Sequence, residues 1–88
     1  MSAKEVAEWM LEYMGDSYWL YQETVVYKIK DKFGTDYVYQ NQGGNLAIGR
    51  NVLKAFRNLT EGMLVWERGE RAWRPKRKHD REARGVAS

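Results

Sequence analysis

The stretch LAIGRNVLKAFRNLTEGMLVWERGERAWR, residues 46–74, is the most informative about the fold because it joins a helical pattern to a strand pattern. Within it, Ile48, Val52 and Phe56 recur at intervals of four residues, which places their apolar side chains on one face of a helix. This spacing predicts an amphipathic helix over about residues 46–60. The rest of the stretch changes to the alternating pattern that is typical of β-strands.

The strand pattern at residues 63–74 predicts a β-hairpin. A two-residue type II′ turn that begins with Gly69 would place glycine at the position that requires a positive φ. Trp66 then faces Trp73 across the hairpin, and a cross-strand tryptophan pair is a strong packing unit. Pro75 is expected to end the second strand, because proline has no N–H to donate to the ladder.

Two further helices are predicted upstream. The first, over about residues 3–14, begins with a capping box in which the Ser2 hydroxyl accepts a hydrogen bond from the Glu5 amide. The second, over residues 23–33, contains β-branched residues that favour a strand, but its apolar residues keep helical spacing. Three lysines late in this segment, and Gly34 just beyond it, favour the helix.

Short extended pieces and a turn separate the helices. Residues 18–21 and 37–40 are short and rich in tyrosine, which predicts brief strands. Residues 41–44, NQGG, have the composition of a turn. Asn45 is then expected to cap the helix over residues 46–60.

The order of these elements is helix, extended piece, helix, turn, helix and β-hairpin, which is the order of a winged helix. We therefore predict an α+β fold that is winged-helix-like, with three helices and a C-terminal β-hairpin wing. The helix over residues 46–60 would be the recognition element, and the hairpin over residues 63–74 the wing. The connection from Gly34 to Asn45 is longer than the three or four residues of a compact helix-turn-helix.

Four segments carry a further indication of the fold: YVYQNQGGNLAI at residues 37–48, VLKAF at 52–56, VWER at 65–68 and WR at 73–74. Together they resemble a small bacterial family of unknown function, whose pattern covers most of this chain. The alternating charges near the C-terminus match that pattern less clearly. The resemblance implies a compact bacterial domain and implies no activity.

Length and composition restrict the classes of protein. A chain of 88 residues has room for one domain, expected at residues 1–75, followed by a basic and flexible tail at residues 76–88. The absence of cysteine excludes disulfides, thiolate zinc sites and a cysteine nucleophile. No apolar run reaches the roughly 20 residues of a membrane helix, and the start MSAKEVAEW lacks the pattern of a secretory signal. We therefore expect a cytoplasmic protein that does not contact a membrane.

The sequence contains no arrangement of residues that indicates catalysis or metal binding. His79, the only histidine, lies beside Asp80, and no second histidine or cysteine can complete a metal site with it. A catalytic pair of these two residues would also lack a nucleophile and a pocket. We therefore expect a non-enzymatic protein with no catalytic residues, no metal ligands and no cofactor.

Charge is distributed unevenly along the chain, although the total is only +3. Residues 1–45 carry four lysines against seven acids, a balance of −3. Residues 46–88 carry eleven lysines and arginines against five acids, a balance of +6. A basic half indicates a polyanionic partner such as nucleic acid, and the alternative is a solvated surface followed by a basic tail.

The helix over residues 46–60 gives the strongest functional indication, because it contains no acid. Arg50, Lys54 and Arg57 are spaced to share its polar face, where arginine can pair with guanine and lysine with phosphate. The basic residues of the hairpin and the start of the tail would contact backbone phosphates. The predicted contacts to nucleic acid, more specifically duplex DNA, are Asn45, Arg50, Asn51, Lys54, Arg57, Arg68, Arg71, Arg74, Lys76 and Arg77. The polar face of a helix is also often charged simply because it meets water.

The aromatic residues favour a second hypothesis. There are twelve of them, and Tyr18, Tyr21, Tyr37 and Tyr39 are the candidates for exposure. Exposed tyrosine is typical of protein interfaces. The alternative function is therefore a winged-helix protein-interaction module with an aromatic partner surface, in which the basic tail has no role. A homodimer through the helix over residues 3–14 and this aromatic region would suit a DNA-binding module, because dimers read two half-sites.

Overall fold

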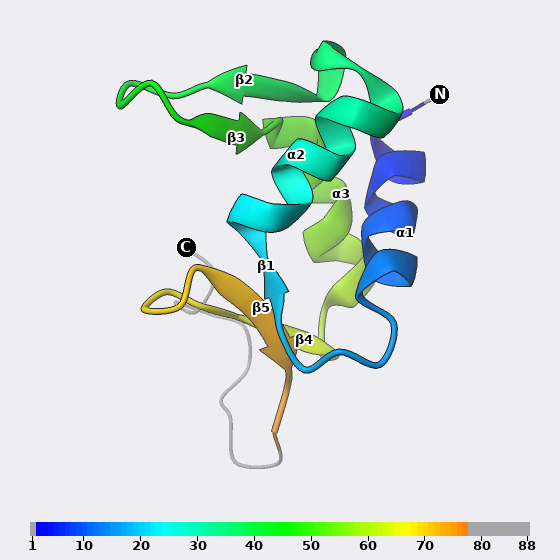
Figure 1. Ribbon diagram of the computed structural model, residues 1–88. Coiled ribbons are helices and arrows are strands. Elements are labelled where there is room, and N and C mark those ends of the chain that lie inside the picture. Colours follow the sequence, from blue (N-terminus) through cyan, green and yellow to red (C-terminus); the bar gives the residue numbers. More distant parts are fainter. Residues whose placement is uncertain (1, 78–88) are drawn as a thin grey trace.

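The computed structural model describes residues 2–77, which form helices and short antiparallel strands (Figure 1). In chain order the elements are α1 (Ala3–Met14), β1 (Leu20–Tyr21), α2 (Gln22–Phe33), the 3₁₀ helix η1 (Thr35–Tyr37), β2 (Val38–Gln40), β3 (Leu46–Ile48), α3 (Arg50–Thr60), β4 (Leu64–Glu67) and β5 (Ala72–Pro75). The predicted α+β class, with three α-helices and a C-terminal hairpin, is confirmed for this part of the chain. The prediction of a flexible tail falls largely on residues 78–88, outside the described residues.

The two N-terminal helices begin and end within one residue of their predicted bounds. The Ser2 hydroxyl accepts a hydrogen bond from the Glu5 N–H at 3.2 Å, as the capping box predicts. Gly34 ends α2 with a φ of 91°, a left-handed conformation that glycine adopts without a side-chain clash. The strands β1 and β2 lie within the two segments that were predicted to be extended.

The predicted start of the third helix is wrong. Leu46–Ile48 form β3, which pairs antiparallel with β2, and α3 begins only at Arg50. The residue between them, Gly49, still donates its N–H to the Tyr37 carbonyl at 2.7 Å. The backbone groups of this segment therefore pair with the preceding strand, and helical hydrogen bonding starts where that pairing ends.

The turn before β3 explains why the chain returns along β2. The Asn41 side-chain oxygen accepts hydrogen bonds from the N–H groups of Gly43 and Asn45, both at 3.0 Å. An asparagine that binds the backbone ahead of it stabilises a reversal of the chain. Asn45 is therefore part of a hairpin turn and not the cap of α3, a position that Gly49 occupies.

A second sheet joins the two ends of the fold, with its strands in the order β1-β5-β4. Trp66 lies opposite Trp73, as predicted, and the centroids of their rings are 4.7 Å apart in an edge-to-face arrangement. On the other side of β5, Leu20 pairs with Trp73. Because β5 pairs with β1 as well as with β4, the C-terminal hairpin is joined to the N-terminal part of the chain.

The turn of the β4–β5 hairpin differs from the predicted two-residue type. Four residues, 68–71, connect the strands, and a positive φ of 52° occurs at Arg71 and not at Gly69. The Glu70 N–H donates to the Glu67 carbonyl and the Arg71 N–H to the Arg68 carbonyl, each at 3.2 Å. Because two overlapping hydrogen-bonded turns reverse the chain, the left-handed residue comes last.

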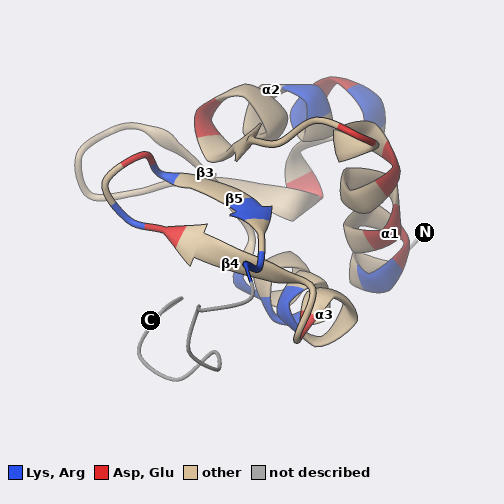
Figure 2. Ribbon diagram, turned by 90° about the horizontal axis from the view of Figure 1, so that it is seen from below, with Lys and Arg blue, Asp and Glu red and all other residues tan. Residues whose placement is uncertain are grey.

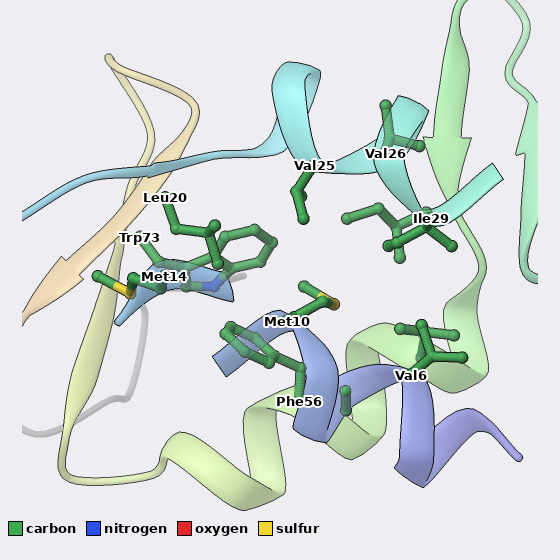
Figure 3. Packing of buried hydrophobic residues seen from close by; sticks show 12 residues of the cluster. Val6, Met10, Met14, Leu20, Val25, Val26, Ile29, Phe56 and Trp73 are labelled. Atoms are coloured by element: carbon green, nitrogen blue, oxygen red, sulfur yellow. The ribbon is translucent and has the colours of Figure 1, made fainter. Parts of the chain in front are cut away.

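The three helices and the β1-β5-β4 sheet enclose one apolar core (Figure 3). Val6 and Met10 of α1, Ile29 of α2 and Phe56 of α3 are completely buried in it. The Phe56 ring meets the Trp73 ring edge-on with centroids 5.0 Å apart, a geometry worth about 0.5–1.5 kcal/mol beyond area burial. The core thereby fixes which face of α3 points inward.

Candidate nucleic-acid interface

The two faces of α3 differ sharply in their surroundings. Val52, Phe56 and Thr60 are buried on the face that packs toward α1. The Thr60 hydroxyl donates to the Phe56 carbonyl at 2.8 Å, so this buried polar group is satisfied within the helix. With its inner face held in the core, α3 presents its other face to solvent in a fixed orientation.

The outer face carries five exposed residues, which we call the cationic face of α3: Arg50, Asn51, Lys54, Arg57 and Asn58. Figure 2 shows the basic positions along α3, beside β4. The three cations extend over about 10 Å of the helix axis, given the rise of an α-helix. Their side chains make no hydrogen bond or ion pair with another residue of 2–77, so all three charges are available to an external anion.

No carboxylate neutralises this face from within the helix. Residues 50–60 contain no Asp or Glu, and the helix dipole adds partial positive charge at the end where Arg50 lies. The exposed acids Glu5, Glu8 and Glu12 are on a different helix, α1 (Figure 2). The positive potential of α3 is therefore local to this element and is not a consequence of the net charge.

The hairpin turn contributes two further cations. Arg68 and Arg71 are both exposed, at the tip of the β4–β5 hairpin (Figure 2). Glu67 and Glu70 alternate with them along the chain, so the local balance of charge is zero. The turn therefore offers two arginines within a neutral segment, and its attraction for an anion is weaker than that of α3.

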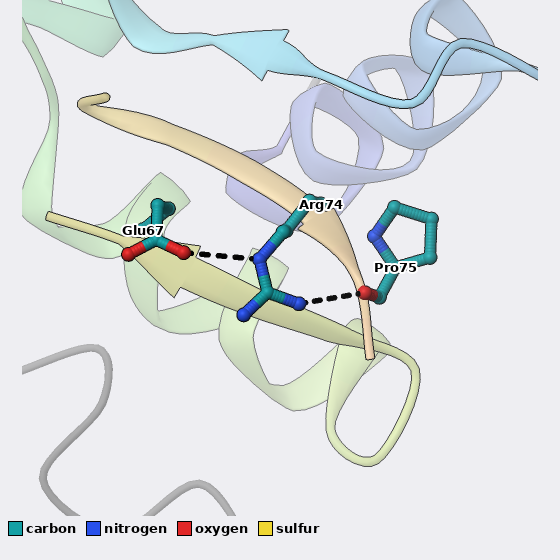
Figure 4. A network of polar contacts seen from close by, with 3 residues as sticks. All are labelled: Glu67, Arg74 and Pro75. Carbon is teal, nitrogen blue, oxygen red and sulfur yellow. Dashed lines mark hydrogen bonds and ion pairs between the residues drawn. The ribbon is translucent and has the colours of Figure 1, made fainter. Parts of the chain in front are cut away.

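Arg74, which is also among the predicted contacts, is nearly buried and has partners within the protein. Its side chain is only 8% exposed, and its Nε donates to Oε2 of Glu67 at 3.1 Å (Figure 4). A second nitrogen, Nη1, donates to the Pro75 carbonyl at 3.1 Å. This arginine links the two strands of the hairpin, and its Nε is already paired with a carboxylate.

The ion pair could have been found from the predicted register. When Trp66 lies opposite Trp73, Glu67 and Arg74 fall on the same face of the hairpin as diagonal neighbours. Diagonal neighbours are within reach of long side chains. If Arg74 is considered only as one of the basic residues of the hairpin, its partner Glu67 is overlooked.

The remaining predicted contacts lie away from α3 or at the end of the described chain. Asn45 is exposed in the β2–β3 turn. Lys76 is half-buried, and its N–H donates to the Met63 carbonyl at 2.8 Å, which extends the hairpin by one residue. Arg77 is exposed. The structure thus brings together the four predicted residues of α3 and, separately, the two arginines of the hairpin turn.

The predicted aromatic surface is present in part. Tyr18, Tyr21 and Tyr39 are between 41% and 43% exposed, whereas Tyr37 is half-buried. Sequence reasoning missed Tyr13, which is 42% exposed and has its ring centroid 5.2 Å from that of Trp9. Because Tyr13 keeps helical spacing with the buried Val6 and Met10, the sequence pattern alone does not distinguish it from a core residue.

The described residues offer few features of other functional classes. Between residues 2 and 77, no three acids or histidines are grouped so that they could hold a metal ion. None of the helices in that part of the chain is long and apolar enough to cross a membrane. His79 and Asp80 lie outside the described residues.

A comparison with models of protein families finds one whose description is a family of unknown function (DUF6953), matched by residues 2–75. The chain belongs to this family. The DUF6953 match ends at Pro75, the last residue of β5, and so includes every strand and helix described above. A comparison with curated proteins finds no match. A comparison with solved structures finds none either. The family description assigns no activity.

Proposed function

We propose that the protein binds nucleic acid, in the first place duplex DNA, through the cationic face of α3. The observation that carries the proposal is the exposure of Arg50, Lys54 and Arg57 on one helix that contains no acid. The proposed binding uses no cofactor and no catalytic group. We also propose that the protein is located in the cytoplasm and forms a homodimer.

The order of elements supports a winged-helix mode of docking. Apart from the inserted β2–β3 hairpin, α1, β1, α2, α3 and the β4–β5 hairpin follow one another as in a winged helix, and β1 pairs beside β5. In that mode α3 enters the major groove, and the hairpin turn with Arg68 and Arg71 lies along the backbone. Arg74 is not part of this interface.

The chemistry of the cationic face fits both kinds of contact to DNA. Arginine can donate two hydrogen bonds to a guanine, and asparagine can pair with an adenine in the same groove. Lys54 and the N-terminus of α3 would hold phosphates, because both present positive charge to solvent. Arg50, Asn51 and Arg57 would then face base edges.

The first experiment is a fluorescence-anisotropy titration of labelled random duplex at two salt concentrations. Binding in the micromolar range that weakens steeply with salt is expected, because Lys and Arg release counterions from the DNA. Reversing two charges, Arg50→Glu with Arg57→Glu, should abolish binding while the far-ultraviolet circular dichroism stays unchanged, since both side chains are exposed.

A matched control changes the same amount of charge elsewhere. Lys28 and Lys30 are exposed on α2, and Lys28→Glu with Lys30→Glu lowers the net charge by the same four units. This variant should retain binding. If it loses binding as fully as the α3 variant, attraction depends on net charge alone and the assignment to α3 is wrong.

The second candidate is a protein-interaction module, and exposed aromatics around the end of α1 favour it. Tyr13, Trp19 and Tyr21 line a cavity of about 290 Å³ there, and Tyr18 is exposed beside it. Light scattering after gel filtration at high salt, without nucleic acid, separates the two functions. The protein-interaction function is supported by a stable stoichiometric complex or dimer that is lost in the double variant Tyr13→Ala with Tyr21→Ala.

A further inference from the structure

We propose that the cavity between α3 and the β4–β5 hairpin binds a zwitterionic small molecule with a planar aromatic group, of the aromatic amino-acid class. The cavity has a volume of about 350 Å³ and lies at the C-terminal half of α3. It is separate from the cationic face of α3 except at Arg57 and Asn58, which belong to both. The inference goes beyond the proposed function and does not depend on it.

The walls of the cavity are apolar and aromatic. Leu53 of α3 and Leu64 of β4 line it, together with the indoles of Trp66 and Trp73. The two indoles meet edge-on and are held in place, because Trp73 also packs against the buried Phe56. A planar ring that enters between leucine side chains and a fixed indole gains both apolar burial and aromatic contact.

Two opposite charges at the same cavity select the ligand class. Arg57 and Glu61 both line it, four residues apart, and both are exposed. No ion pair joins them in the structure, and neither makes a side-chain hydrogen bond to another residue of 2–77. A carboxylate on the ligand would pair with Arg57, and an ammonium group would pair with Glu61.

The end of the helix reinforces this polarity. Glu61 is the C-terminal cap residue of α3, where unpaired carbonyls carry partial negative charge and favour a cation. A ligand with only a negative charge would be repelled by Glu61 and these carbonyls. A ligand with only a positive charge would be repelled by Arg57. The volume is near the lower limit of about 300 Å³ for small-molecule pockets, which suits a single ring with a short charged end.

The test is a titration of the ¹⁵N-labelled full chain with L-phenylalanine, without DNA, followed by two-dimensional NMR. Saturable shifts are expected for the indole N–H signals of Trp66 and Trp73, while that of Trp9, outside the cavity, stays fixed. Phenylacetate lacks the ammonium group and phenethylamine lacks the carboxylate. Each should bind at least about tenfold more weakly, because one charged contact is lost.

Matched variants locate the carboxylate. Arg57→Gln should raise the dissociation constant of L-phenylalanine about tenfold or more, whereas Lys54→Gln, an equal loss of charge one turn away and outside the cavity, should leave it unchanged. No saturable shift at millimolar L-phenylalanine would overturn the proposal. Equal binding of phenylacetate would also overturn it. Because this titration contains no DNA, a failure of L-phenylalanine to bind does not affect the proposed DNA contact. A failure of DNA to bind likewise does not affect the proposed ligand site.

Discussion

At the scale of single residues, Gly49 sits where the β2–β3 hairpin passes into α3. A Cβ built there would lie 2.9 Å from the Tyr37 carbonyl oxygen, closer than van der Waals contact permits. Gly49→Ala should therefore destabilise the protein by about 1–3 kcal/mol, the usual cost of overpacking. Urea unfolding followed by tryptophan fluorescence measures it. Gly69→Ala, which meets no atom within 4 Å, is the control and should change the free energy of unfolding by less than about 0.5 kcal/mol.

The Arg74–Glu67 pair makes a second residue-scale prediction. Glu67→Gln removes the charge that faces a nearly buried guanidinium, so it should cost about 1–3 kcal/mol of stability. Glu70→Gln makes the same chemical change at an exposed position of the adjoining turn and should be near neutral. Equal midpoints of urea unfolding for the two variants would mean that the ion pair contributes nothing to the hairpin.

At the scale of elements, the sequence predicts most accurately where a pattern is local. The first helix and the Trp66–Trp73 register follow from a capping box and from strand alternation, and both are confirmed. The start of α3 was misplaced because Leu46–Ile48 continue the apolar spacing of the helix, although they pair with β2. Helical spacing cannot distinguish a short buried strand in this position, since pairing with β2 depends on a chain reversal at Asn41.

The candidate site could likewise be predicted from the sequence where the pattern is local to one element. The exposed face of α3 could be predicted, because an amphipathic helix fixes its polar side once the apolar side is known. The partner of Arg74 lies on the neighbouring strand of the same hairpin, so it follows from the strand register and not from composition. The apolar cavity could not be predicted, because it forms where the hairpin meets α3.

The hairpin turn makes a prediction at this scale. Arg71 has a φ of 52°, a left-handed conformation that costs a non-glycine residue about 1 kcal/mol. Arg71→Gly should therefore raise the free energy of unfolding by up to about 1 kcal/mol, and thermal unfolding by circular dichroism measures it. Arg68→Gly, at the other end of the turn and without a positive φ, should lower stability instead. Stabilisation by both changes would point to relief of charge repulsion and not of backbone strain.

At the scale of the whole molecule, two neighbouring helices, α1 and α3, carry charge of opposite sign. Glu5, Glu8 and Glu12 are exposed on α1, and the cationic face belongs to α3, although the two helices pack against each other. A polyanion approaching the protein would therefore be oriented before contact, because it is repelled from one helix and attracted to its neighbour.

This arrangement gives a quantitative expectation for the salt dependence of DNA binding. If Arg50, Lys54, Arg57, Arg68 and Arg71 each displace about one counterion from the DNA, whether they face a phosphate or a base edge, the logarithm of the binding constant should fall with the logarithm of salt concentration with a slope of about −4.5, at about 0.9 per cation. Replacing Arg50 and Arg57 by glutamine should reduce the magnitude of the slope by about 2, because two contacts are removed. Replacing Lys28 and Lys30 of α2 by glutamine removes the same charge and should leave the slope unchanged.

Anisotropy titrations at four or more salt concentrations measure all three slopes. Equal reductions in both variants would mean that DNA responds to the charge of the whole molecule, and unchanged slopes in both would place the contacts on neither helix.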